Sequence, residues 1–180
     1  LVKELAQAFP NKKNLGIDYS SRAIALAKAL NPKLSFLNTN ITRNKINLKF
    51  DSATLIEVLE HIPKKEIKGF IAAISNLLSA QGILYLTVPH QNMPLQKKHI
   101  QHFTLLSLKK LLDPYFTVQK VAYIGEQSWR YQTVLLLLAN PLFILNHKGL
   151  RNIIYSFYKK HLFISKEKDC SRIYLKLIKK

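Results

Sequence analysis

The sequence is poor in cysteine, glycine and long apolar runs, and each shortage excludes a class of protein. The single cysteine, Cys170, rules out an internal disulfide and a cysteine-based zinc site, and it fits a reducing, cytoplasmic setting. Glycine occurs five times and never in a G-x-G pattern, so these 180 residues hold no glycine-rich phosphate loop. The longest apolar run, residues 133–145, contains Pro141 and is shorter than the roughly 20 residues that span a bilayer.

Acidic residues are also few. Ten Asp and Glu stand against 28 Lys and Arg, a formal net charge of +18. Residues 91–180 carry most of the excess, with 16 basic and four acidic side chains. That half is the expected site for an anionic partner, such as a membrane surface or an acidic substrate, although a merely solvated lysine-rich surface is the alternative. No basic stripe interleaved with aromatic residues indicates nucleic-acid binding.

Hydrophobic residues make up 48% of the chain and recur with clear periods. Ser20 or Ser21 can cap a helix that stops before Pro32, and Thr104 can cap another. The apolar strand that ends at Glu57 is typical of strands buried on both faces of a parallel sheet. The alternation of strands and helices predicts an α/β doubly wound domain. The periods predict helices over residues 1–9, 22–30, 64–78 and 105–112. They predict strands over 14–18, 34–40, 52–59, 83–89, 116–125 and 171–180, and a mostly helical region over 127–165.

Asp18 ends the first predicted strand, in the run "GIDYS". In doubly wound nucleotide-binding folds an acidic residue in this position holds the ribose hydroxyls, about 20 residues after a glycine-rich loop. Counting back that distance passes Leu1. We therefore expect the loop and the first strand upstream of Leu1, which makes this chain a fragment of a longer reading frame.

Four segments in order resemble the class I S-adenosylmethionine-dependent methyltransferases. They are "LGIDYSSRAIALAKA", "FDSATLIEVLEHIP", "LLSAQGILYLTVPH" and "HIQHFTLLSLKKLL". The resemblance is to the broad methyltransferase domain group that includes ubiquinone-type O-methyltransferases. It implies a Rossmann-like sheet that here lacks its first strand and its Gly-rich loop. The implied divisions are a partial cofactor-binding core over 1–126, a helical cap or insertion over 127–168, and the last strand over 169–180.

The resemblance also implies which residues bind S-adenosylmethionine. Asp18 would accept bonds from both ribose hydroxyls, with Ile17 and Tyr19 beside the adenosine. Asn40 and Ile41 would lie at the adenine. The remaining cofactor contacts would be Glu57 and Val58, at the end of the strand that faces the missing one. The strands ending at Asp18 and Glu57 would then each have an unpaired edge, and the 180-residue chain would bind the cofactor weakly or not at all.

Glu57, Glu60 and His61 form an acidic cluster in a basic chain, and three interpretations stay open. They can line the cofactor pocket and favour the start of the next helix electrostatically. His61 can act as a general base, which is the one catalytic candidate. Some ubiquinone-type relatives suggest instead a divalent metal held by all three, although no metal site is our main expectation.

The resemblance places the acceptor beside the loop after "VPH", which implies that His90, Asn92, His99 and His102 face it. His99 and His102 could ligate a metal, but the sequence shows no third ligand near them. Residues 127–165 fit either a helical cap over the substrate or an amphipathic pair on anionic lipid. The implied activity is methyl transfer to a small, sugar- or lipid-linked acceptor. The alternatives are a degenerate, non-catalytic binding module and a basic protein associated with membranes or nucleic acid.

Overall fold

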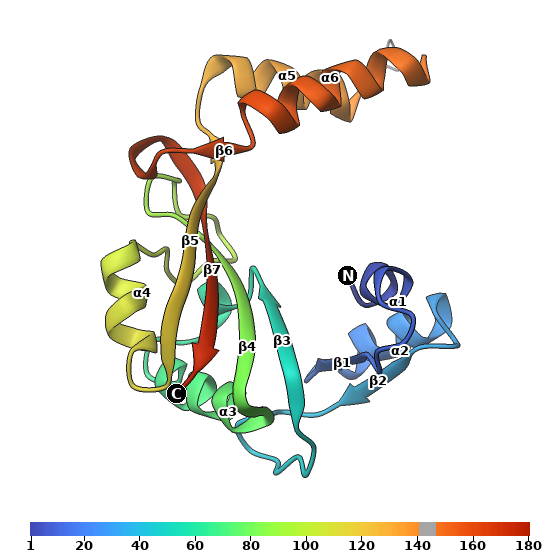
Figure 1. The fold of residues 1–180 in the computed structure, drawn as a ribbon, viewed down its shortest axis with the longest axis vertical. Helices are drawn as coiled ribbons and strands as arrows, with labels where there is room; N and C mark the ends of the chain where they lie inside the picture. Colours follow the sequence, from blue (N-terminus) through green and yellow to red (C-terminus); the bar gives the residue numbers. More distant parts are fainter. Residues whose placement is uncertain (141–146) are drawn as a thin grey trace. The chain divides into compact units, whose positions relative to one another are not determined.

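The computed structural model describes residues 1–140 and 147–180 (Figure 1). Residues 141–146, with Pro141 and the end of the apolar run, lie outside the described part. The chain divides into two compact units, Leu1–Leu48 and Lys49–Lys180.

The first unit contains two helices and a pair of parallel strands. Its elements are α1 (Val2–Ala8), β1 (Leu15–Asp18), α2 (Ser21–Leu30) and β2 (Ser35–Asn38). The Ser20 hydroxyl caps α2 by accepting a bond from the backbone N–H of Ala23, which decides between the two predicted caps. The helix ends at Leu30, directly before the predicted Asn31-Pro32 stop.

The second unit is built on a five-stranded sheet with the order β3-β4-β7-β5-β6. β3 and β4 are parallel, whereas β7 runs antiparallel to both of its neighbours, β4 and β5. The strand that comes last in the sequence therefore lies between two earlier ones (Figure 1). The strands are β3 (Phe50–Ile56), β4 (Leu78–Pro89), β5 (Phe116–Glu126), β6 (Ile164–Ser165) and β7 (Cys170–Lys179).

The core of this unit gathers on β7 and the strand beside it. Ile173, Leu175 and Leu177 alternate along β7 and are completely buried. Helix α3 (Ile67–Leu77) buries the predicted apolar stripe, and α4 (Leu105–Leu112) begins at a capping box between Thr104 and Ser107. The predicted mixed α/β architecture is confirmed.

β3 differs from its prediction. Most of its residues are exposed, and Leu55 is its one buried side chain. The expectation of burial on both faces was wrong, because β3 is the edge strand of its sheet and pairs with β4 alone. β1 likewise has β2 as its one partner strand among the described residues. The predicted open edges of these two strands are thus observed.

The region after β5 is mostly helical where it is described, as predicted. It contains α5 (Trp129–Ala139) and α6 (Lys148–His161), which pack against each other through Leu138, Ile154 and Tyr158. Figure 1 shows this pair beyond the end of the sheet at which β5 and β6 meet. Within the described ranges, no helix has both the length and the apolar character needed to cross a membrane.

Candidate functional site

Asp18 lies at the carboxyl end of β1, where β2 also ends. Its side chain is exposed, and one carboxylate oxygen accepts a bond from the Ser20 backbone N–H at 2.8 Å. The other oxygen has no partner in the described part of the chain. A carboxylate with an open oxygen at a strand end suits a hydroxyl-bearing ligand.

The other residues expected around the adenosine differ in how open they are to a ligand. The Asn40 side-chain oxygen already accepts two bonds from Thr42, at 2.9 Å from its N–H and 2.7 Å from its hydroxyl. An adenine amino group would have to compete with both. Ile17 and Ile41 are half-buried, and Tyr19 is 78% exposed beside Asp18. The expected cofactor contacts of all four residues stay predictions.

Glu57 follows β3 directly and is held in the left-handed region, with φ of +53°. Its two carboxylate oxygens are already engaged: the Thr87 hydroxyl donates to one at 3.0 Å, and Arg172 donates to the other at 3.1 Å. The backbone N–H of Glu57 also donates to Thr87. Glu57 therefore ties the end of β3 to β4 and β7, a role that no sequence pattern indicates. The half-buried Val58 follows it.

The loop after β4 is fastened onto the short helical turn η1 (Leu59–His61). The Ile100 N–H donates to the Glu60 carbonyl at 2.8 Å, and the Gln101 side chain donates to the Ile62 carbonyl at 2.9 Å. These bonds bring the imidazole of His99 next to that of His61, with ring centroids 5.0 Å apart. Two segments about 40 residues apart thus form one side-chain cluster, which we call the Glu60 cluster: Glu60, His61, His99 and His102.

Hydrogen bonds fix where the protons of these imidazoles lie. His61 Nδ1 is 2.8 Å from the Lys98 carbonyl, so it must donate, because a carbonyl only accepts. His102 Nδ1 donates in the same way to the Met93 carbonyl at 3.1 Å. In neutral His102 the Nε2 atom then accepts, and His99 Nδ1 donates to it at 2.8 Å. His61 and His99 both carry their proton on Nδ1 and leave Nε2 with a free lone pair.

Glu60 lies at the buried end of this cluster. Its side chain is fully inaccessible, and neither carboxylate oxygen has a hydrogen-bond partner within the described residues. Burial raises the pKa of Glu60, and the nearby Glu57 carboxylate adds to the effect. Burial also lowers the pKa of His99, with His102 and His61 contributing. Both shifts favour uncharged forms.

The Glu60 carboxylate and the Nε2 atoms of His61 and His99 are therefore all acceptors, and none of the three can donate to another. Ligand atoms of Glu60, His61 and His99 lie within 4.8 Å of one another, which suits a proton or a divalent cation. The sequence shows no third ligand near His99 and His102, and the structure instead brings His99 to Glu60 and His61, because the loop folds back onto η1. The donor set also differs from the one considered above, since Glu57 is bound to Arg172 and His99 takes its place.

His90 and Asn92 lie apart from this cluster, at the end of β4. His90 is buried, and its Nδ1 accepts a bond from the Asn92 N–H at 3.0 Å. Burial lowers the pKa of His90, whose Nε2 has no hydrogen-bond partner in the described structure and is 3.9 Å from Glu167. The Asn92 amide donates to the Glu167 and Cys170 carbonyls. Both residues tie the loop to β7, and their role toward an acceptor stays a prediction.

Comparison with known proteins finds a matching family profile and similar folds. The profile of the methyltransferase domain family matches residues 1–84. No curated protein sequence matches the chain. Solved structures with a similar fold include the following three. The N-methyltransferase NodS from Bradyrhizobium japonicum WM9, in complex with S-adenosyl-L-homocysteine, has a TM-score of 0.58 at 14% identity, over 92% of this chain and 65% of that one.

The second is an S-adenosylmethionine-dependent methyltransferase from Clostridium acetobutylicum, with a TM-score of 0.63 at 13% identity, over 98% of this chain and 80% of that one. The third is the magnesium protoporphyrin IX methyltransferase ChlM from Synechocystis PCC 6803, with bound S-adenosylmethionine. It has a TM-score of 0.57 at 16% identity, over 98% of this chain and 63% of that one. The chain thus spans about two thirds of two of these proteins. The methyltransferase domain profile thus matches residues 1–84, and the chain has the fold of the class I S-adenosylmethionine-dependent methyltransferases.

Proposed function

We propose that the protein takes part in methyl transfer from S-adenosylmethionine to a small, sugar- or lipid-linked acceptor. The observation that carries the proposal is Asp18, whose open carboxylate lies at a strand end inside the matched methyltransferase domain. Two of the similar structures hold S-adenosylmethionine or its demethylated product, which supports the same cofactor here.

The residues of the first unit fit part of this cofactor. The free oxygen of Asp18 can accept a bond from a ribose hydroxyl, and the exposed Tyr19 ring can cover an adjacent apolar surface. Asn40 fits less well, because Thr42 occupies its oxygen. When bound, S-adenosylmethionine supplies an electrophilic methyl group on a sulfonium.

The Glu60 cluster supports a role on the acceptor side. An acceptor hydroxyl or amine must lose a proton during methylation, and His61 Nε2 has a free lone pair and a half-exposed ring. His99 presents a second lone pair beside it, fixed by His102. We assign the general-base role to His61 and a positioning role to His102. His90 and Asn92 complete the proposed acceptor side through the loop that they anchor.

Ligand-observed NMR tests the cofactor assignment, because it detects weak binding. We expect S-adenosyl-L-homocysteine to show saturation transfer to its ribose and adenine protons with the 180-residue chain, at an affinity weaker than micromolar. Asp18→Ala should remove the transfer, whereas Asp51→Ala, which removes an exposed carboxylate from β3, should retain it. Equal signals from the parent chain and Asp18→Ala would overturn the assignment.

A non-catalytic binding module is the second candidate, favoured by the lack of any G-x-G pattern. Such a module would bind S-adenosyl-L-homocysteine through Asp18 yet leave S-adenosylmethionine unconsumed with every acceptor offered. A cytoplasmic location stays a prediction from cysteine usage.

A further inference from the structure

The helices α5 and α6 carry a large exposed apolar surface. On α6, Leu150, Ile153 and Phe157 recur at helical spacing and are 47%, 67% and 39% exposed. No residue of α6 is buried. On α5, Trp129 is 78% exposed and Leu136 is 62% exposed. Isolated apolar residues on a surface are common, but this many on two adjacent helices mark an interaction site.

The side of α6 that packs on α5 is a different one. Ile154 and Tyr158 face the small core around Tyr131, Val134 and Leu162. The exposed stripe is therefore left over after the two helices have packed together. The Arg130 guanidinium lies 5.9 Å from the Phe157 ring, which places a positive charge beside the stripe.

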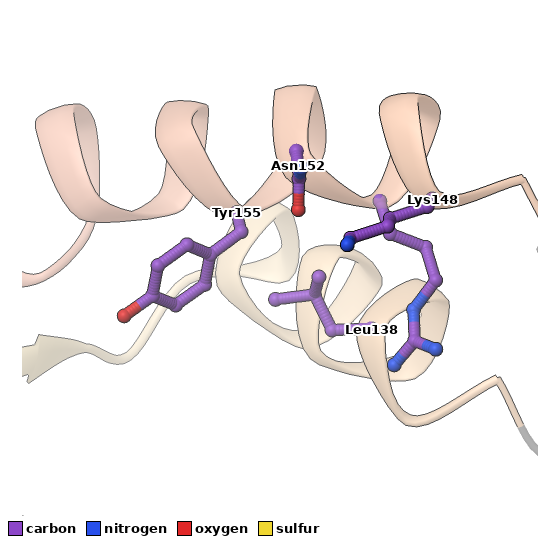
Figure 2. A pocket seen from close by; sticks show the side chains of 5 residues that line it. Leu138, Lys148, Asn152 and Tyr155 are labelled. Carbon is purple, nitrogen blue, oxygen red and sulfur yellow. The ribbon is translucent and has the colours of Figure 1, made fainter.

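A third side of α6 is basic. Lys148, Arg151, Asn152 and Tyr155 line a pocket of about 330 Å³ together with Leu138 of α5. Figure 2 shows the side chains of Lys148, Asn152 and Tyr155 gathered above Leu138. Two cations, an amide and a phenol around an apolar floor suit a phosphate group linked to an apolar molecule.

The charge of the whole segment is of one sign. Residues 127–166 contain six Lys and Arg and no Asp or Glu. A second copy of this surface would repel the first, and a nucleic acid offers no match for the apolar stripe. An anionic lipid bilayer matches both features, because an interfacial helix buries its apolar side among acyl chains while its basic side stays among headgroup phosphates.

We propose that α5 and α6 bind the surface of an anionic phospholipid membrane, with Leu150, Ile153 and Phe157 inserted and Lys148 and Arg151 on headgroup phosphates. Trp129, at the start of α5, lies at the membrane–water boundary, where tryptophan is enriched. This inference is independent of the proposed methyl transfer, because it rests on the two helices alone.

Trp129 is the chain's one tryptophan, so its fluorescence reports binding without a label. The full 180-residue chain is mixed with vesicles of phosphatidylcholine alone or of phosphatidylcholine with 25% phosphatidylglycerol. We expect a blue shift and co-sedimentation with the anionic vesicles, both lost in high salt, and neither with the neutral ones. Lys148→Gln with Arg151→Gln should lower partitioning roughly fivefold per charge, and Ile153→Ser with Phe157→Ser roughly tenfold or more.

Matched controls come from α4, where Leu106 is 64% exposed and Lys109 and Lys110 lie in the last turn. We expect two α4 variants to bind vesicles as the parent does: Leu106→Ser, and Lys109→Gln combined with Lys110→Gln. The circular dichroism spectrum should be unchanged in every variant. The proposal is overturned if the α4 controls lose binding equally, or if anionic vesicles leave Trp129 unchanged. It is also overturned if the blue shift arises only with an oligonucleotide, or only with self-association that Ile153→Ser abolishes.

Discussion

Replacing Glu60 by Gln should stabilise the protein at neutral and alkaline pH. The carboxylate of Glu60 is fully buried without a hydrogen-bond partner among the described residues, and it lies near the His61 and His99 imidazoles. A buried polar group left without a partner costs roughly 1–3 kcal/mol, and more when it is charged. Glutamine keeps the size of the side chain, removes the charge and supplies an N–H₂ that can donate to His61 or His99.

The pH dependence has a definite sign. Because burial raises the pKa of Glu60, the folded protein holds this proton more tightly than the unfolded chain does. The stability from protonated Glu60 is therefore present below the ordinary value of 4.5 and is lost as pH rises through the raised pKa. The advantage of Glu60→Gln should be largest at pH 8 and should vanish toward pH 4.

Thermal unfolding followed by circular dichroism measures the effect, with Tm moving about 2–4 °C per kcal/mol for a chain of this length. Glu66→Gln, an exposed substitution at the start of α3, is the matched control and should leave Tm unchanged. The same scans with Zn²⁺ show whether the Glu60 cluster holds a proton or a divalent cation. At a Zn²⁺ concentration 100 times the dissociation constant, binding would add about 2.7 kcal/mol to the free energy of unfolding of the parent and little to that of Glu60→Gln.

A Glu60→Gln variant that is less stable than the parent at pH 8 in chelator would refute this reasoning. It would mean that the folded state stabilises the ionised carboxylate, so that the groups around Glu60 include a hydrogen-bond donor. An equal rise in Tm with Zn²⁺ in both proteins would place the metal outside the Glu60 cluster. The cluster would then bind a proton and not a metal ion.

Two further outcomes follow from the geometry. Nitrogen-15 NMR spectra of the histidines at pH 8 should show the Nδ1–H tautomer for His61 and His99. His102→Leu should remove this tautomer preference in His99 alone. An Nε2–H tautomer of His99 in the parent chain would contradict the assigned bonds. Gly125→Ala should destabilise the protein by about 2 kcal/mol or more, because φ is +74° and the new Cβ would lie 2.3 Å from the Ser171 hydroxyl oxygen. Gly69→Ala, in open space within α3, should instead stabilise it by about 0.5–1 kcal/mol. A neutral Gly125→Ala would show that this end of β5 can relax.

Features set by neighbouring residues could be predicted from the sequence. The Ser20 and Thr104 caps, the stop before Pro32 and the apolar stripe of α3 all occur where the pattern indicated. Each depends on contacts within a few residues, so a short window of sequence contains the cause. The position of Asp18 at a strand end was predictable for the same reason.

The Glu60 cluster could not be predicted, because it forms through backbone bonds between distant segments. The Ile100 N–H and the Glu60 carbonyl have no side-chain signature, and any residue pair could supply them. The partners of Glu57 likewise come from β4 and β7, and only the sheet order brings Arg172 to it. The exposure of β3 had the same cause: its apolar composition suits a central strand, yet its place in the sheet decides its burial.

The placement of β7 has a consequence for how this unit is made. Residues 170–179 follow every other strand of their sheet in the sequence, yet they lie between β4 and β5. While the chain emerges from the ribosome, those two strands cannot pair with each other and keep open edges until β7 arrives. The fully buried Ile173, Leu175 and Leu177 then join both halves of the sheet in one late step. Until that moment the nascent chain exposes the surfaces on which chaperones act and from which aggregation begins.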